Sequence, residues 1–445
     1  MADLDRKLTL FGLTMVAIGS CIGSGIFVTP SQVATVVPHH AFVLLVWMIG
    51  GLIALTGALT FAELGSLFPQ AGGVYVFLKE AYGELAGFLY GWVILLVINT
   101  GALAALSIAL AEYLGYFVEL NQNEKIGLAI AVIAGLTLIN ALGISSSQWL
   151  AKVFTALKLV AIFGIIIAGL LFYQPEQVIL SFDMTKNVPE NLGSALLLAL
   201  IGVLWSFGGW HHASYLAGET IQPQKTVPRA MILGAVVVTI TYVLVNLAYM
   251  LLLPLDAIAA TNKVAGEAVG TLLSYGGQLV AVAIAISIFG TIAIYTMSAP
   301  RIYFAMAKDG IFFSKLAYVH PRFHTPIYAM FLQAFWAILL LLFWGTFAEL
   351  ITYVTFMDIA FMGLAGASVY IFRRKIPQQE GRYFTLGYPW IPFLFVAISG
   401  AFVLNTLIQR PEQAIAGLLF LLLGIGCYFY FKKKQVLPEK TPDAI

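Results

Sequence analysis

Long apolar stretches separated by short polar connections run through the chain, and twelve of them are long enough to cross a ~30 Å hydrocarbon core as helices. The predicted spans cover residues 12–36, 41–64, 84–117, 126–143, 150–172, 193–216, 230–253, 278–306, 327–345, 348–372, 389–409 and 412–431. The third and eighth are longer than a perpendicular helix requires, so we expect them to tilt or to project beyond the bilayer. The pattern therefore predicts an all-α integral membrane protein.

Composition and charge agree with this prediction. Of the 445 residues, 61% are hydrophobic and 10% are charged, which is typical of a membrane protein, and the net charge of +2 gives no indication of a nucleic-acid partner. With the N-terminus in the cytoplasm, 18 of the 23 Lys and Arg residues fall on the cytoplasmic side, 4 fall on the other side, and Lys158 lies within a span. The positive-inside rule thus favours a plasma-membrane protein with both termini cytoplasmic.

The first span contains the sequence IGSCIGSGIFVTP, residues 18–30, with three glycines and two serines at its centre. Glycine in a helix interior costs ~1 kcal/mol relative to alanine, and small hydroxyl residues offer the backbone competing hydrogen bonds. We therefore expect the helix to open here. In hydrocarbon, the freed backbone groups need protein, water or a ligand as partner, so an open helix indicates a cavity for a small polar solute. The alternative explanation of the small residues is a close contact between two helices.

The sixth span contains a second candidate break, WSFGGW at residues 205–210, followed by His211 and His212. Interrupted helices at matching positions of two halves are the best sequence indication of a transporter site, and this coincidence favours the cavity at both places. Adjacent helical residues face different directions, so we expect at most one of the two histidines to line the cavity.

The expected segments are an N-terminus (1–11), a first five-span repeat (12–172), an extracellular loop (173–192), a second, inverted repeat (193–372), a cytoplasmic loop (373–388), two further spans (389–431) and a polar tail (432–445).

Motifs spread over spans 1 to 11 carry a family resemblance. In chain order they are IGSCIGSGIFVTP, WMIGGLIALTGALTFAELG, GGVYVFLKEAYG, FTALKLVAIFGIIIAGL, WSFGGWHH, ETIQPQKTVPRA, YVLVNLAYM, MAKDG and the FRRK…YP run. Together they resemble the amino acid–polyamine–organocation (APC) superfamily and, within it, a bacterial member of the L-type amino-acid transporter branch. The resemblance implies the LeuT-type fold of inverted five-helix repeats, with an amino acid held between the broken helices 1 and 6, exchange without sodium, and no cofactor.

One feature of the branch is missing from this sequence. Animal members are joined to a glycoprotein subunit through a cysteine between spans 3 and 4, whereas residues 119–125 contain no cysteine. We therefore expect no disulfide-linked heavy-chain partner. The expected partners are the amino-acid substrate and the lipid bilayer.

The ends of a broken helix suit the two charged groups of an amino acid. One end leaves N–H groups at the positive end of the helix dipole, and the other leaves C=O groups. The carboxylate should meet the amides of Gly23, Ser24 and Gly25, and the ammonium should meet carbonyls near Ser20, Cys21 and residues 205–207. The complete set of predicted substrate-binding residues is Ser20, Cys21, Ile22, Gly23, Ser24, Gly25, Trp205, Ser206, Phe207 and Gly208.

Lys158 lies in the middle of the fifth span, where a lysine costs ~2.5–3.5 kcal/mol on insertion. It should therefore face a partner or a cavity, or it should extend its ammonium to the cytoplasmic interface. The resemblance implies that Lys158 faces a partner within the protein, because the matching lysine of the branch lies near span 1, where sodium-coupled relatives hold a cation.

Three other residues, Trp205, Tyr242 and Asp358, are candidates for gating or coupling alongside Lys158. Trp205 matches the gating aromatic of the family, with a core or interfacial anchor as the alternative. Tyr242, Asn99 and Thr100 are cavity candidates on family position, with core packing as the alternative. Asp358 either biases the cavity towards polar or cationic side chains or pairs with a neighbouring hydroxyl. No spacing of His, Cys and acidic residues predicts a metal site.

The sequence thus predicts a secondary transporter that moves L-amino acids by alternating access, as a sodium-independent exchanger of small and medium-sized neutral amino acids. One alternative is a proton-coupled symporter that uses Lys158 and also accepts cationic substrates. A more distant alternative is a membrane-embedded sensor or enzyme, for which no intramembrane catalytic dyad and no soluble output domain is evident.

Overall fold

The computed structural model describes residues 4–176, 178–183, 188–343, 347–377, 381–409 and 411–436. Every regular element in these ranges is helical, and the extended backbone of Leu8 forms a single bridge with Thr220. In chain order the elements are α1 (Leu10–Cys21), α2 (Gly25–Val36), α3 (His40–Leu67), α4 (Val74–Tyr82), α5 (Glu84–Val93), η1 (Ile94–Ile98), α6 (Asn99–Leu114), α7 (Gln122–Ala141), α8 (Ile144–Leu171), α9 (Leu192–Phe207), α10 (His212–Tyr215), η2 (Ala217–Glu219), α11 (Pro223–Leu252), α12 (Leu255–Ala260), α13 (Val264–Gly270), α14 (Gly276–Ser298), α15 (Pro300–Lys308), η3 (Ser314–Ala317), α16 (Ile327–Phe343), α17 (Phe347–Lys375), α18 (Trp390–Gln409) and α19 (Pro411–Val436).

The chain is a multi-pass membrane protein. Within the described ranges, nine helical stretches are long and apolar enough to cross a membrane, and the bent pair α1–α2 raises this number to ten. The predicted spans at 327–345 and 412–431 coincide with α16, which has 17 residues, and α19. The helix α19 continues to Val436, beyond the predicted end of the last span, and the rest of the predicted tail lies outside the described residues.

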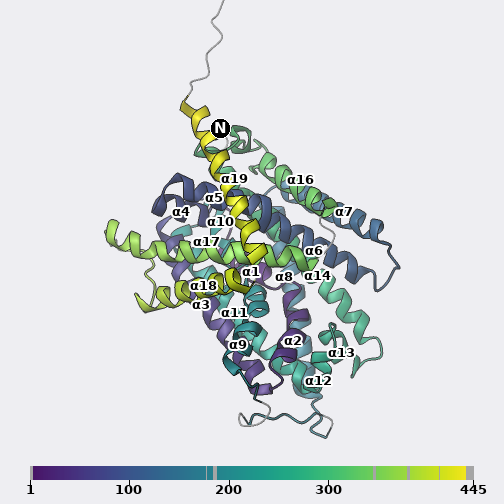
Figure 1. Ribbon diagram of the computed structural model, residues 1–445. Coiled ribbons are helices and arrows are strands. Elements are labelled where there is room, and N and C mark those ends of the chain that lie inside the picture. Colours follow the sequence, from purple (N-terminus) through teal and green to yellow (C-terminus); the bar gives the residue numbers. More distant parts are fainter. Residues whose placement is uncertain are drawn as a thin grey trace, which may run out of the picture.

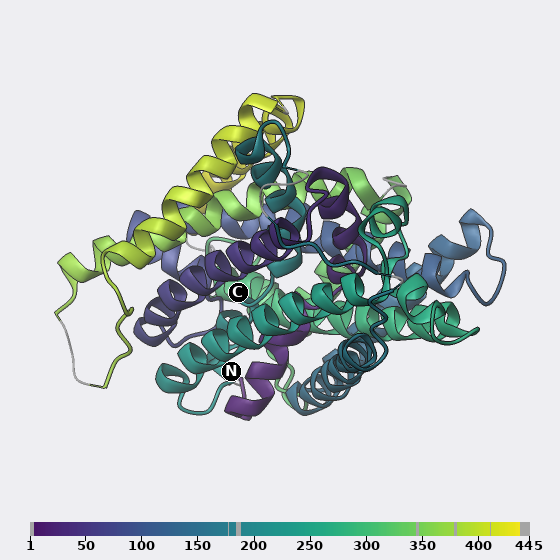
Figure 2. The same ribbon diagram turned by 90° about the horizontal axis from the view of Figure 1, so that it is seen from below.

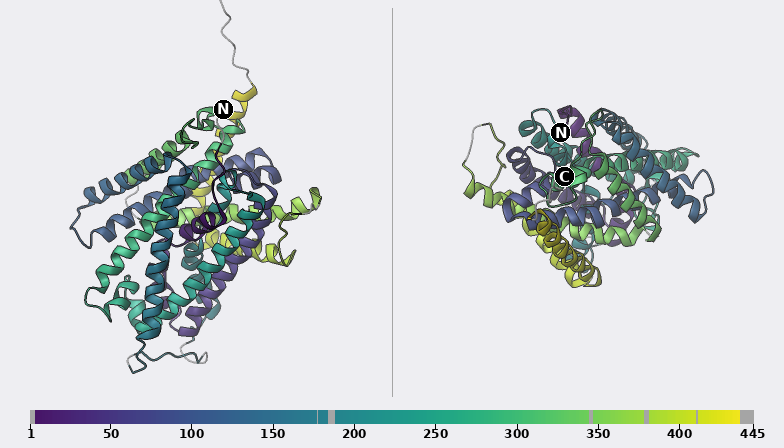
Figure 3. Two further views of the ribbon diagram at one scale, coloured as in Figure 1. Left: turned by 180° about the vertical axis from the view of Figure 1, so that it is seen from behind. Right: turned by 90° about the horizontal axis from the view of Figure 1, so that it is seen from above.

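The helix α1 lies inside the bundle and not on its surface. Most of its residues are buried, and it packs against α8, α11 and α14. Seen from behind, this short purple helix is surrounded by later parts of the chain (Figure 3). Small residues allow the close approach, because a Cβ atom added to Gly19 would lie 2.1 Å from the Thr155 Oγ1 atom of α8. The first predicted break is therefore placed at the centre of the molecule.

The two ends of the bundle differ. The start of the chain and the end of α19 lie at one end, and α12 and α13 lie at the opposite end (Figure 1). In the view from the α12 end, the yellow C-terminal helices lie along one edge (Figure 2). Only 22% of the apolar window of α18 is buried inside the protein. An apolar helix exposed in this way is suited to contact lipid.

The two over-long predicted spans are irregular in their middle. The third runs from Glu84 to Leu114 as α5, η1 and α6, and η1 is a π-helical turn. Such turns are frequent at functional sites, and Ile94 and Ile98 of η1 line the cavity described below. The eighth span divides into α14 and α15 next to Pro300, because proline lacks the N–H group that would continue the helix.

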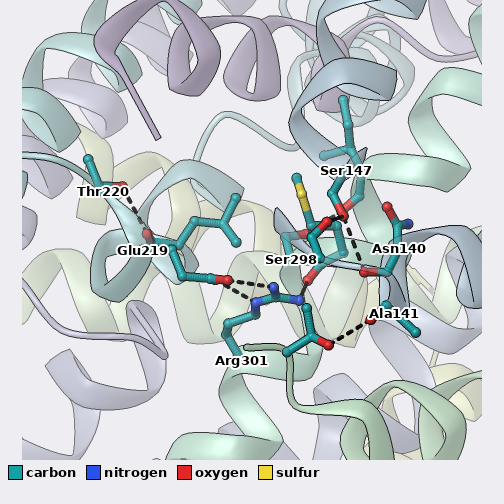
Figure 4. A network of polar contacts seen from close by, with 12 residues as sticks. Asn140, Ala141, Ser147, Glu219, Thr220, Ser298 and Arg301 are labelled. Atoms are coloured by element: carbon teal, nitrogen blue, oxygen red, sulfur yellow. Dashed lines mark hydrogen bonds and ion pairs between the residues drawn. The ribbon is translucent and has the colours of Figure 1, made fainter. Parts of the chain in front are cut away.

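A buried ion pair holds the segment that follows the second break. Arg301 of α15 donates from Nε to the Glu219 Oε2 atom at 2.7 Å and from Nη2 to Oε1 at 2.8 Å, and both side chains are fully buried (Figure 4). The carbonyl of Glu219 also accepts the N–H groups of Lys7 and Leu8, each at 2.9 Å. The ion pair thus ties η2 to α15, and the backbone bonds tie η2 to the start of the chain.

Candidate functional site

The first predicted break is present. The helix α1 ends at Cys21, α2 begins at Gly25, and the two axes are bent by 42°. The Gly23 N–H group donates to the Cys21 carbonyl at 2.9 Å, so the expectation that this amide is free for a carboxylate is wrong. The hydrogen of the Gly23 amide is used by the tight turn between the two helices. The amides of Ser24, Gly25 and Ile26 have no acceptor in the described part of the chain, so the start of α2 presents free donors at its positive dipole end.

The second predicted break is also present and contacts the first. The helix α9 ends at Phe207, and residues 208–211 form a turn before α10. The Ser20 hydroxyl lies 2.8 Å from the Gly209 carbonyl, which joins the two breaks directly. Gly209 has φ +119°, and a Cβ atom there would lie 2.6 Å from the Ser20 carbonyl oxygen. Only glycine fits both this backbone conformation and this close approach.

Replacing Gly209 with alanine is expected to lower the free energy of unfolding by ~1–3 kcal/mol and to weaken substrate binding, because the turn must move away from Ser20. Thermal unfolding in detergent and binding of a labelled amino acid measure the two effects. The matched control is Gly164→Ala on α8, where a new methyl group meets nothing within 4 Å. Equal behaviour of the two variants would show that this close contact contributes neither to stability nor to binding.

Tyr242 of α11 lies between the two breaks. Its hydroxyl is 3.0 Å from the Cys21 carbonyl and 3.0 Å from the Ser206 carbonyl, so it can donate to either. The ring makes an edge contact with Trp47 at 5.5 Å and packs on Phe207 at 5.0 Å. Tyr242 is fully buried and lies behind the cavity wall. It therefore positions the ends of α1 and α9.

Lys158 of α8 reaches the open segment from the other side. Its ammonium donates to the Gly19 carbonyl at 2.9 Å, the Ile22 carbonyl at 2.6 Å and the Thr291 hydroxyl at 3.0 Å. The side chain is 1% exposed, so it does not extend to the interface. Ser287, one turn before Thr291 on α14, lies 3.1 Å from the same Ile22 carbonyl. These donors compensate the carbonyls that the break leaves without intrahelical partners.

A cavity of about 120 Å³ lies where the two breaks meet. This volume is well above the ~15 Å³ needed by one buried water, so the cavity has room for a small solute. Among the predicted site residues, Ile22, Lys158 and Tyr242 lie behind its wall. The others line it: Ser20, Cys21, Gly23, Ser24, Gly25, Trp205, Ser206, Phe207, Gly208 and Asp358.

Comparison with known proteins identifies the family. Residues 8–430 match the family model described as amino acid permease. The chain belongs to the amino acid permease family. The permease is 33% identical to the serine/threonine exchanger SteT of Bacillus subtilis over 96% of each chain. Two human proteins are also similar: the large neutral amino acids transporter small subunit 2 (31% identity, 99% of this chain and 83% of the relative) and the cystine/glutamate transporter (29%, 99% and 87%).

Family membership makes this permease an amino-acid transporter of the APC superfamily and not an enzyme. The family also implies the LeuT-like fold. In the described part of the chain, no group of His, Cys, Asp and Glu residues is arranged to hold a metal ion.

The wall of the permease cavity contains polar side chains from several helices. Asp358 of α17 lines it, and its Oδ1 atom is buried without a hydrogen-bond partner in the described ranges. Asn99 of α6 also lines it and donates to the Tyr295 carbonyl at 3.4 Å. Thr100 lies outside the wall and bonds the Leu95 carbonyl within its own span at 2.6 Å.

Both histidines after the second break line the permease cavity, so the expectation that only one does is wrong. His211 lies in the turn and His212 begins α10, and their rings are 4.9 Å apart. The rule that separates neighbouring residues by a fixed rotation applies within a regular helix, and here the helix is interrupted. His212 stacks on Tyr295 at 4.3 Å and hydrogen-bonds Ser298 at 2.6 Å.

Several residues of the permease site were missed in the sequence. Tyr215 and Tyr295 line the cavity, and Ser287 and Thr291 bond the open segment. The sequence did contain an indication of Ser287 and Thr291. They are small hydroxyl residues four positions apart in an apolar span, which places both on one face of α14. The tyrosines carry no comparable signal, since aromatic residues are common throughout the chain.

Proposed function

We propose that this permease exchanges small and medium-sized neutral L-amino acids across the plasma membrane, without sodium and by alternating access. The observation that carries the proposal is the meeting of two broken helices at one cavity, where α2 offers free amides and α1 offers the Ser20 carbonyl, which has no donor in the described chain. The printed functions of two relatives, a serine/threonine exchanger and a large neutral amino acid transporter, support the same substrate class.

The proposed binding mode uses the backbone for the charged groups that all amino acids share. The substrate carboxylate accepts hydrogen bonds from the amides of Ser24 and Gly25 at the start of α2. The ammonium donates to the Ser20 carbonyl and to the carbonyl end of α9. Trp205 lines the cavity beside these groups and serves as the aromatic that closes over the substrate. Lys158 replaces a metal ion in holding the open segment, and Tyr242 couples the two breaks.

We also propose the complete topology. The chain has twelve spans, with inverted repeats at 12–172 and 193–372, cytoplasmic termini, and no disulfide-linked heavy chain. Contact between the breaks of the first and sixth spans supports the pairing of the two halves. The positions of the chain start and of the end of α19 at one end of the bundle support placing both termini on one side (Figure 1).

Proteoliposomes containing the purified permease test the proposed exchange. Labelled L-alanine or L-serine should enter vesicles preloaded with the same amino acid and should not accumulate in empty vesicles, with or without sodium outside. Exchange without net uptake is expected because the empty carrier reorients slowly. Accumulation in empty vesicles driven by an inward proton gradient would instead establish the symporter alternative, which the buried Lys158 ammonium favours. Failure of every amino acid to exchange or accumulate would refute both.

A further inference from the structure

One carboxylate group, that of Asp358, lies in the wall of the cavity between the broken helices. Asp358 lines the cavity from α17, and its Oδ1 atom is buried and accepts no hydrogen bond in the described ranges. Buried polar groups in proteins are nearly always hydrogen-bonded, and buried charges are nearly always paired. The Asp358 oxygen is therefore available to a group that enters the cavity.

Among the described residues, no Lys, Arg or His side chain pairs with Asp358. Its electrostatic neighbours are the phenols of Tyr90, Tyr215 and Tyr295. Two of these phenols, Tyr90 and Tyr215, hydrogen-bond each other at 2.5 Å. The buried ammonium of Lys158 already has three acceptors at the open segment. The described part of the chain therefore supplies no donor to the Asp358 Oδ1 atom, and a solute in the cavity can supply one.

We propose that Asp358 is the side-chain subsite of the permease and accepts a hydrogen bond from a hydroxyl or an amine on the substrate side chain. This proposal rests on the proposed function, because the backbone groups of the two breaks must first hold the α-carboxylate and α-ammonium. The side chain then enters the remainder of the cavity, whose wall there includes Ile98, Met362 and Asp358. A site with a fixed buried acceptor rejects an analogue that lacks the donor.

Competition against exchange of labelled L-alanine by the unaltered permease tests this subsite. Threonine and valine have nearly the same size and differ in one hydroxyl group, and diaminobutyrate and norvaline differ in one amine. The donor-bearing member of a pair should compete better by about tenfold or more, the usual effect of one hydrogen bond to a charged acceptor. Serine should exceed O-methylserine for the same reason. A preference within the first pair identifies a hydroxyl substrate, a preference within the second identifies an amine, and equality in both overturns the proposal.

Two variants assign the preference to Asp358. Asp358→Leu keeps the size and removes the acceptor, so both preferences should disappear. Asp358→Asn keeps an acceptor oxygen without the charge, so the preference for threonine should persist while that for diaminobutyrate is lost. Where exchange by a variant is too slow, equilibrium binding of the same pairs to the purified protein gives the ratio. Unchanged ratios in Asp358→Leu would overturn the assignment.

The same data separate this proposal from the proposed function. If alanine exchanges and the matched pairs compete equally, only the Asp358 subsite is refuted. If no amino acid competes with alanine or exchanges, the proposed function itself fails.

Discussion

Replacing Lys158 with methionine should reduce amino-acid exchange by about 100-fold or more while leaving the protein inserted and folded. Methionine keeps the length of the side chain and removes the ammonium that bonds the Gly19 and Ile22 carbonyls at 2.9 and 2.6 Å. Hydrogen bonds to a charged group contribute ~1.5–3 kcal/mol each, so the two together stabilise the open segment by ~3 kcal/mol or more. Without them, the geometry that receives the substrate is rarely populated. Counterflow in proteoliposomes measures the loss.

The control for this variant lies on the same helix. Lys152 places its ammonium 5.9 Å from the ring of Phe11 and makes no side-chain hydrogen bond to the described residues, so Lys152→Met should exchange at the wild-type rate. Membrane content and the elution profile in detergent show whether each variant is folded. Wild-type exchange by Lys158→Met would remove the role proposed for this lysine and, with it, the proton-coupled alternative.

Replacing Arg301 with methionine should lower the free energy of unfolding by ~3–5 kcal/mol, because it leaves the Glu219 carboxylate buried without its counter-charge. Both side chains are fully buried, so water cannot solvate the remaining charge. Exchange should also decline, since η2 follows the second break and the ion pair attaches η2 to α15 (Figure 4). Unfolding in a denaturing detergent titration measures the loss of stability.

The double variant Glu219→Gln with Arg301→Met should recover most of the lost stability, since no uncompensated charge remains. The control is Lys432→Met, which breaks an ion pair with Glu84 at 3.2 Å whose side chains are each 50% exposed. A pair of this kind contributes less than ~1 kcal/mol. Equal losses from Arg301→Met and Lys432→Met would show that burial of the first pair has no energetic consequence.

The predicted helix ends were least accurate where polar residues continue a helix. The helix α11 begins at Pro223, whereas the predicted span began at residue 230. The helix α8 begins at Ile144, whereas the predicted span began at residue 150. Hydropathy identifies only the part of a helix that lies in the hydrocarbon core, whereas backbone hydrogen bonding continues the helix into the polar interface. The family resemblance and the positions of both breaks depend on local sequence, and they could be predicted without the fold.

Sequence alone determined the membrane class, the family and the two points at which helices open, because apolar length, glycine and hydroxyl content and local motifs act over a few residues. Only the tertiary structure decided that Ser20 contacts Gly209, that Tyr242 joins the two breaks, and that both histidines face the cavity. It also showed that the Gly23 amide donates within its own turn and that the Asp358 Oδ1 atom is buried with no hydrogen-bond partner in the described ranges. These facts depend on groups far apart in the chain or on the path of an interrupted backbone, and the packing of the whole bundle sets both.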